Sequence, residues 1–231
     1  MKGKLYGIGT GPGDPELLTI KAVKAIQRCG VIAIPKTAND ERTAYSIVEE
    51  YLQGKELLEC RFVMDEDLSK RKEARQIAAA DIIQFLDKGN DLGFVTLGDP
   101  TTYSSYMYVH EIIVSKGYDA EIVPGITSYT AAAAAFGIAL CEGDETLTLI
   151  PARHGYNIDE LFNYPGNKVL MKSGENLNCV LKKLKEHGYG EKTRIACRVS
   201  MDSQRLYTCI DEFEESKETG YFTLAIVREK N

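Results

Sequence analysis

Long hydrophobic runs are missing from this sequence. No apolar stretch approaches the ~20 residues that a membrane-spanning helix needs. The start, Met1-Lys2-Gly3-Lys4, leads into a short predicted strand and lacks the apolar core of a secretory signal. Low-complexity tracts and short repeats are also missing. We therefore expect a cytoplasmic protein that has no membrane partner.

Positive charge is in deficit. The chain carries 28 Lys and Arg against 34 Asp and Glu, a net charge of −6. A protein that binds nucleic acid through its overall potential needs the opposite balance. The composition therefore argues against a nucleic-acid partner, although it leaves room for a local basic cleft.

Paired cysteines and nucleotide-binding loops are missing too. The six cysteines form no CxxC pair, which favours reduced thiols in a cytosolic protein and no metal site. No GxxxxGK[ST] motif occurs, so P-loop chemistry is excluded. The glycines of residues 7–13 lack the GxGxxG spacing, and no acid follows the second predicted strand, where Pro35 and Lys36 stand. These absences exclude a Rossmann dinucleotide site and argue against the common methyltransferase fold.

The most informative stretch that is present covers residues 92–103. An apolar run over 94–97 stops at Gly98-Asp99-Pro100, and Thr101 opens a segment with helical spacing. The pattern predicts a buried strand, a tight turn and a helix start. Gly98 allows a ligand to approach the backbone, and Asp99 either caps the helix or reaches a polar ligand group. A plain structural corner with a capping Asp is the alternative.

Strands and helices alternate in the first half of the chain and give way to a strand-rich second half. This predicts an α/β fold class with two α/β domains: residues 1–116 with a mostly parallel sheet, and residues 117–231 with a mixed sheet. The last two predicted strands look like antiparallel partners. The predicted strands are 5–8, 31–34, 57–63, 94–97, 120–123, 145–151, 168–172, 193–199, 205–209 and 221–227, and the predicted helices are 16–28, 43–52, 69–88, 101–116, 129–136 and 176–187.

Histidines suggest little chemistry. His110 falls on a predicted helix and His187 at a helix end, where packing and the helix dipole explain them. His154 follows a predicted strand and is the one histidine with a functional interpretation, beside the alternative of a surface residue. No Ser/His/Asp or Cys/His set is recognisable.

Three motifs carry a family resemblance. The stretches Gly9-Thr-Gly-Pro-Gly-Asp-Pro-Glu-Leu-Leu-Thr19, Gly98-Asp-Pro-Thr-Thr-Tyr103 and Pro124-Gly-Ile-Thr-Ser128 resemble those of the tetrapyrrole methylases of cobalamin biosynthesis, in the same order and separation. Within that family, Asp144-Glu-Thr-Leu-Thr-Leu-Ile-Pro-Ala152 is similar to the precorrin-2 and cobalt-precorrin-2 C-20 methyltransferases. The resemblance covers essentially the whole chain.

The resemblance implies a two-domain methyltransferase, usually a homodimer, that holds S-adenosylmethionine in a cleft between its domains. By position in the motifs, the expected cofactor contacts are Pro12, Leu97, Gly98, Asp99, Thr102, Thr127, Ser128, Met171 and, within about a residue, Val199. The implied reaction needs no activated side chain, because a nucleophilic meso carbon of the reduced tetrapyrrole attacks the sulfonium methyl. No catalytic base is assigned, and cobalt, if present, belongs to the substrate.

Substrate capture requires a local basic cluster, because the expected substrate carries about eight carboxylates by family resemblance while the chain is net negative. The candidates are basic residues in predicted strand-end loops, with His154 as an added donor: Lys36, Arg153 and Lys172. Two alternatives stay open. One is a methylase of the same fold that acts at another macrocycle position or on ribosomal RNA, and the other is a non-catalytic module that binds an anionic ligand.

Overall fold

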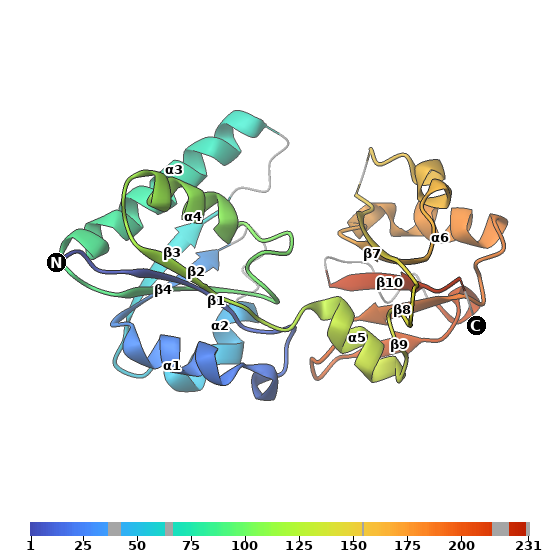
Figure 1. Ribbon diagram of the computed structural model, residues 1–231, viewed down its shortest axis with the longest axis horizontal. Coiled ribbons are helices and arrows are strands. Elements are labelled where there is room, and N and C mark those ends of the chain that lie inside the picture. Colours follow the sequence, from blue (N-terminus) through green and yellow to red (C-terminus); the bar gives the residue numbers. More distant parts are fainter. Residues whose placement is uncertain (37–42, 63–66, 154, 214–221, 230–231) are drawn as a thin grey trace. The chain divides into compact units, whose positions relative to one another are not determined.

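The computed structural model describes residues 1–36, 43–62, 67–153, 155–213 and 222–229. It divides into an N-terminal unit, Met1–Thr127, and a C-terminal unit, Ser128–Asn231. Each unit contains one five-stranded sheet and is described by itself (Figure 1).

The N-terminal sheet is parallel throughout, in the order β3-β2-β4-β1-β5. The side chains of its central strands are buried. This is expected of a parallel sheet, which is covered on both faces and whose strands are therefore continuous apolar runs in the sequence. The strands are β1 (Leu5–Gly9), β2 (Val31–Lys36), β3 (Glu56–Arg61), β4 (Leu92–Thr96) and β5 (Ala120–Val123). All five carboxyl ends therefore meet at one edge, where α/β proteins bind ligands.

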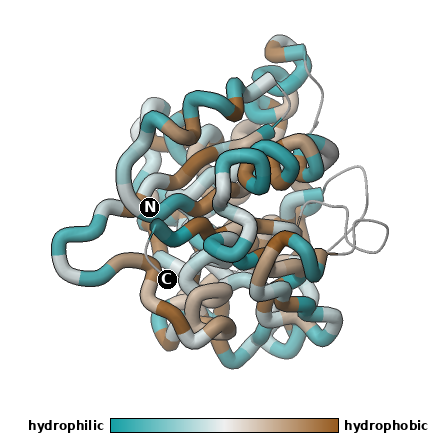
Figure 2. The backbone as a smooth tube through the Cα atoms, turned by 90° about the vertical axis from the view of Figure 1, so that its right-hand side faces the viewer, coloured by the Kyte–Doolittle hydropathy of each residue, from teal (hydrophilic) through white to brown (hydrophobic). Residues whose placement is uncertain are grey.

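Two helical layers cover this sheet. Helices α1 (Ile20–Arg28) and α2 (Thr43–Val48) pack on one face, and α3 (Leu68–Asp87) and α4 (Tyr106–Ser115) on the other (Figure 1). Figure 2, in which the side of the C-terminal unit faces the viewer, shows hydrophilic and hydrophobic residues interspersed along the backbone.

The first helix starts later than the sequence predicts. Residues Pro15–Leu17 form a 3₁₀ turn capped by Asp14, and α1 begins after Thr19, whose Oγ1 accepts from the amide of Ala22 at 3.0 Å. Two successive capping residues interrupt the helix expected over 16–28. Ile20, at the first helical position, is consequently 75% exposed, while Ala22 and Ile26 supply the buried face.

The C-terminal sheet is mixed, in the order β6-β7-β10-β8-β9. The strands are β6 (Leu147–Pro151), β7 (Asn167–Met171), β8 (Thr193–Cys197), β9 (Arg205–Tyr207) and β10 (Thr223–Val227). The prediction that β9 pairs with β10 is wrong, since β8 lies between them and pairs antiparallel with both. Helix α6 (Leu177–Glu186) packs on the core of this sheet, and α5 (Ser128–Phe136) contacts β10.

The boundary between the units differs from the expected division at residues 116 and 117. Strand β5 pairs in register with β1, Leu5 opposite Ala120, and so completes the first sheet. The chain therefore passes to the second unit only after Thr127. The change in composition near residue 117 marks the end of α4 and not the end of the domain.

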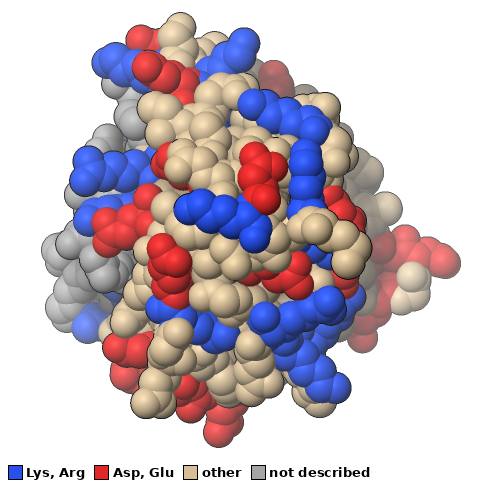
Figure 3. Space-filling model, turned by 90° about the vertical axis from the view of Figure 1, so that its left-hand side faces the viewer, with Lys and Arg blue, Asp and Glu red and all other residues tan. Residues whose placement is uncertain are grey.

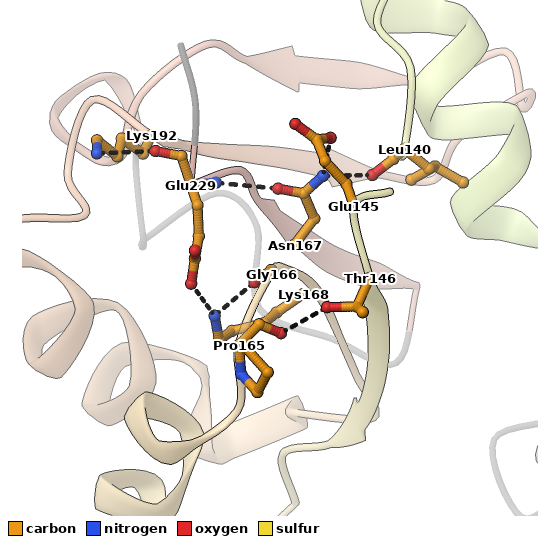
Figure 4. Close-up of polar contacts among 9 residues, drawn as sticks. All are labelled: Leu140, Glu145, Thr146, Pro165, Gly166, Asn167, Lys168, Lys192 and Glu229. Carbon is orange, nitrogen blue, oxygen red and sulfur yellow. Dashed lines mark hydrogen bonds and ion pairs between the residues drawn. The ribbon is translucent and has the colours of Figure 1, made fainter. Parts of the chain in front are cut away.

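A buried lysine organises the amino end of β7 (Figure 4). Lys168 is fully buried, and its Nζ donates to the carbonyl of Gly166 at 2.6 Å and lies 3.1 Å from Glu229 Oε1. Asn167 accepts from the amide of Glu229 at 3.0 Å and donates to the carbonyl of Leu140 at 2.8 Å. These bonds join the last described turn of the chain to the segment before β6, so this network is structural.

Acidic and basic side chains alternate over the face shown in Figure 3. Ion pairs of the N-terminal unit include Lys4 with Asp119 and with Glu121, both at 3.2 Å. Among the described residues, no helix has the length and apolar composition to cross a membrane.

Candidate functional site

Three loops meet at the carboxyl edge of the N-terminal sheet, after the adjacent strands β4, β1 and β5. The first two are joined by backbone hydrogen bonds: Gly98 donates to Gly11 at 2.7 Å, and Gly11 donates to Gly98 at 3.2 Å. Thr10 donates its amide to the Thr96 carbonyl at 2.9 Å. Both Gly11 and Gly98 have positive φ, +75° and +72°, which glycine adopts without strain.

Glycines also bring the third loop into direct backbone contact with the other two. A Cβ on Gly9 would lie 2.6 Å from the amide nitrogen of Gly125, and a Cβ on Gly125 would lie 2.2 Å from the carbonyl oxygen of Gly98. Both distances are far below van der Waals contact with atoms that cannot move aside. Gly9, Gly98 and Gly125, here called the glycine contact, hold the three loops at one point.

The carboxylate of Asp99 fastens the same loops through side-chain bonds. Asp99 is 8% exposed, its Oδ2 accepts from the amide of Gly125 at 3.0 Å, and its Oδ1 accepts from the amide of Thr101 at 2.8 Å and from the Thr101 hydroxyl. The expected capping of the helix is not seen, because α4 begins at Tyr106 after the cap position Ser105; Asp99 instead closes a turn with Thr101 and clamps the loops after β4 and β5 together.

The loop after β4 is longer than the sequence predicts. Helix α4 begins at Tyr106, five residues after the expected start at Thr101, because Tyr103 has a positive φ that a right-handed helix cannot include. Ser104 Oγ accepts from the Tyr106 amide at 3.2 Å and lies 2.9 Å from Thr96 Oγ1. Tyr103 is 44% exposed and has a φ of +51°, a strained conformation for an aromatic residue.

The structure brings most of the expected N-terminal site residues to this one edge. Pro12 is buried next to the Gly11 bridge, and Leu97, Thr102 and Thr127 are half-buried. Lys36 ends β2 at the same edge, and its Nζ lies 3.0 Å from Glu59 Oε2 on β3. That ion pair gives Lys36 a structural role independent of any ligand.

The remaining expected residues belong to the C-terminal unit. Strands β6 and β7 run parallel, and β8 runs in the same direction because β10 is antiparallel to both β7 and β8. Arg153, Lys172 and Val199 therefore follow the carboxyl ends of three strands at one edge, and Met171 ends β7. Ser128 is the first residue of α5 and is half-buried.

Hydrogen bonds tie the loops at this second edge together. Ala152 donates its amide to the Met171 carbonyl at 2.9 Å, and Asn176 Nδ2 donates to the Ala152 carbonyl at 3.0 Å. Two hydroxyls in these loops, Ser173 Oγ and Tyr156 OH, are buried without a hydrogen-bond partner among the described residues. Burial raises the pKa of Tyr156. The functional interpretation of His154 concerns a residue that lies outside the described part of the chain.

Three residues at these edges were not identified from the sequence: Gly9, Gly125 and Arg198. Gly9 and Gly125 stand in motifs that were recognised, but only their spatial contact reveals why glycine is needed. Arg198 directly follows β8 and was not selected, because the predicted strand ran on to residue 199. The sequence feature that could have identified Arg198 is its position as a basic residue at the end of an apolar strand.

The family match covers most of the chain. Residues 4–213 match the family described as Tetrapyrrole (Corrin/Porphyrin) Methylases. A probable cobalt-precorrin-2 C(20)-methyltransferase of Methanocaldococcus jannaschii is 31% identical over 97% of this chain and 96% of its own length. The precorrin-2 C(20)-methyltransferase of a Sinorhizobium species is 28% identical, covering 97% and 95% of the two chains.

Solved structures agree on the fold. A cobalt precorrin-4 methyltransferase superimposes with a TM-score of 0.77 at 24% identity, over 97% of this chain and 94% of its own. The uroporphyrin-III C-methyl transferase of Thermus thermophilus, solved with S-adenyl homocysteine, gives 0.70 at 21% identity, over 98% of each chain. Together with the family match, these likenesses lead to one conclusion: the chain belongs to the tetrapyrrole methylase family.

Proposed function

We propose that the protein is an S-adenosylmethionine-dependent methyltransferase that methylates C-20 of cobalt-precorrin-2, or of precorrin-2, in cobalamin biosynthesis. The observation that carries the proposal is full-length similarity to relatives named for that reaction, at 31%, 28% and 26% identity. Two of these three relatives are named for the cobalt-containing substrate, which favours that form here. Cobalt is then part of the substrate and not a metal of the protein.

The edge of the N-terminal sheet fits the proposed cofactor. A Cβ on Gly98 would find no heavy atom nearer than 4.0 Å, so the backbone there is open on the side where a side chain would otherwise stand. Leu97 supplies an apolar side chain, while Thr102 and Thr127 supply hydroxyls. In the C-terminal unit, the residues proposed as contacts are Ser128, Met171 and Val199.

S-adenosylmethionine, when bound, supplies an electrophilic methyl carbon on its sulfonium sulfur, and its carbon–sulfur bond breaks as the nucleophilic meso carbon of the substrate forms the new carbon–carbon bond. The meso carbon then loses its proton to a base that we leave unassigned. The chain has to hold the two reactants in line, and good orientation is worth roughly 7–11 kcal/mol of barrier. The fixed loops of the glycine contact and the Asp99 clamp suit that task.

Methyl transfer tests the proposal directly. The purified protein is incubated anaerobically with S-adenosylmethionine carrying a ¹³C methyl group and with either cobalt-precorrin-2 or precorrin-2. We expect one labelled methyl per macrocycle, located at C-20 by NMR. A label at another carbon would favour a methylase of the same fold with different regiochemistry, and absence of transfer with both substrates would favour a non-catalytic binding module.

The cofactor site is tested by substituting a glycine with a residue that tolerates its backbone. Asn adopts positive φ more readily than other residues, so Gly98→Asn should fold while placing a side chain in the open space. We expect at least a tenfold loss of S-adenosylhomocysteine affinity by calorimetry. The matched control is Gly117→Asn, at a φ of +79° after α4 with nothing within 4 Å. Unchanged affinity in a folded Gly98→Asn variant would contradict the placement.

The compartment and the oligomeric state complete the proposal: we propose a cytoplasmic homodimer. The free state of the six cysteines is compatible with the reducing cytoplasm. The family resemblance implies a homodimer, which light scattering on the purified chain would test. A monomer at micromolar concentration would remove the dimer from the proposal.

A further inference from the structure

Backbone strain in the C-terminal unit is concentrated where its strands end. Among the described residues of this unit, the non-glycine residues with positive φ are Lys172 at +59°, Arg198 at +49° and Ser200 at +64°. Lys172 is the first residue after β7, and Arg198 is the first residue after β8. Such conformations are unfavourable for residues with a side chain and often mark functional positions.

The turn after β8 accounts for the positive φ of Ser200. The amide of Ser200 donates to Gln204 Oε1 at 2.8 Å, and the amide of Met201 donates to the Arg198 carbonyl at 3.0 Å. The conformation of Ser200 therefore belongs to a closed local turn. Arg198 is pinned further by its own amide, which donates to the Phe222 carbonyl at 2.9 Å.

Both strained basic residues keep contact with solvent. Arg198 is exposed, and its guanidinium carbon lies 5.4 Å from the ring centroid of Phe222, within the range of a cation–π contact. Lys172 is half-buried, and Arg153, after β6, is exposed. The three basic side chains therefore follow three strands that point the same way, spread over roughly 14 Å of sheet at ~4.8 Å per strand.

Unsatisfied hydroxyls mark the same loops. Ser173, next to Lys172, is 2% exposed, and its Oγ has no partner among the described residues. The buried hydroxyl of Tyr156 is likewise without one, in the turn that its amide closes on the Arg153 carbonyl at 3.0 Å. Buried polar atoms without partners are rare and call for an explanation, and a ligand rich in acceptors provides one.

We propose that Arg198, which lies outside the substrate residues already named, binds a carboxylate of the substrate together with Lys172 and Arg153. These three residues are here called the basic row. The proposal rests on the proposed function, because a polycarboxylate macrocycle is the ligand whose spaced anions fit a row of this kind. The planar fork of Arg198 suits bidentate binding of one carboxylate, and the ammonium of Lys172 acts as a point charge for a second.

The test separates the effect of the positive charge on ligand binding from the effect of the strained backbone. Arg198→Asn and Lys172→Asn remove the cation but keep a residue that tolerates positive φ. Affinity for uroporphyrin, a stable octacarboxylate macrocycle, is measured by fluorescence quenching at low salt. We expect each variant to bind at least tenfold more weakly, as for loss of a charged hydrogen bond, with a shallower dependence on salt. Thermal stability should stay level or rise, because Asn fits the strained backbone better.

Ser200→Gly is the matched control, since it relieves strain in the same turn without removing charge. We expect this control to keep the wild-type uroporphyrin affinity. Affinity for S-adenosylhomocysteine is measured on every variant, and we expect it to change less than twofold. Selective loss of uroporphyrin would establish the basic row.

Wild-type uroporphyrin affinity in Arg198→Asn would overturn the inference, as would equal loss of both ligands or absence of uroporphyrin binding by the unmodified protein. The proposed function fails by a different measurement, namely absence of methyl transfer to cobalt-precorrin-2 and precorrin-2. The two failures are therefore distinguishable.

Discussion

At the scale of single residues, Asp99, which we propose as a cofactor contact, has a structural role that its hydrogen bonds show. Its carboxylate accepts from Gly125 and from two groups of Thr101, all within the N-terminal unit. Asp14 provides a comparison, because its Oδ1 accepts from a single amide, that of Glu16, at the surface. The two aspartates share the turn geometry and differ in burial.

We expect Asp99→Ala to lower the free energy of unfolding by roughly 2–3 kcal/mol, since buried amides lose their acceptor. Asp14→Ala removes one exposed cap and should cost about 1 kcal/mol or less. Urea denaturation of both variants measures the difference. Equal losses would mean that the Asp99 clamp contributes no more than an ordinary cap.

His110 carries a pH-dependent share of stability. Burial lowers its pKa below the usual 6.5, and its Nδ1 lies 3.0 Å from the hydroxyl of the fully buried Tyr106. The folded state therefore resists protonation, so stability is present above pH 6.5 and falls as the pH drops through the lowered pKa.

The measurement is unfolding free energy against pH in wild type and in His110→Gln. The variant should lose the decline that begins near pH 6.5. Hydrogen bonds to Lys21 and Lys4 lower the pKa of Glu121 from 4.5, so its contribution disappears only in a more acidic window. Identical profiles between about pH 7 and pH 5, the window in which histidine titrates, would show that His110 is not coupled to folding.

At the scale of elements, the glycine contact makes a sharp prediction. Gly125→Ala places a methyl group 2.2 Å from the Gly98 carbonyl oxygen, so the loops after β4 and β5 must separate. We expect a loss of roughly 2–3 kcal/mol in unfolding free energy, in the range of severe overpacking. Gly30→Ala is the control, because nothing lies within 4 Å of the added carbon there.

Calorimetric melting of both variants decides this prediction. A Gly125→Ala protein as stable as Gly30→Ala would mean that the loops part without cost. S-adenosylhomocysteine binding should weaken in Gly125→Ala alone, since the proposed cofactor loops are the ones displaced.

Most elements could be predicted from periodicity and breakers, but their junctions could not. The apolar run before Gly98 became β4, yet the start of α4 depended on the positive φ of Tyr103, which no pattern displays. Pro35 was expected to end the second strand, and β2 continues through it to Lys36. Strands β9 and β10 are adjacent in sequence, but β8 lies between them in the sheet. No sequence pattern indicates that order.

At the scale of the whole molecule, the sequence indicated two α/β parts but placed the division too early. Strand β5 is a short segment after a helix, and only its pairing with β1 assigns it to the first sheet. Most of the proposed site residues were chosen through motifs, and those that the structure describes after strands lie at one edge of each sheet. Arg198 was hidden because its neighbours read as a longer strand.

Amide hydrogen exchange tests the proposed contacts of each unit separately. We expect S-adenosylhomocysteine to slow exchange in residues 97–102 and 125–128 and also in residues 171–173, because the proposed contacts lie in both units. The network around Lys168 should exchange equally with and without the ligand and serves as the internal reference. Protection limited to the N-terminal unit would remove Met171 and Val199 from the proposed site.

The glycine contact also limits how this chain can change during evolution. A substitution at Gly9 or Gly125 meets backbone atoms, and the partner positions are already glycine, so they have no side chain left to shrink. Second-site suppressors of the usual kind, in which a neighbour becomes smaller, therefore do not exist for these positions. We therefore expect substitutions in the basic row to be compatible with folding more often than substitutions at Gly9 or Gly125.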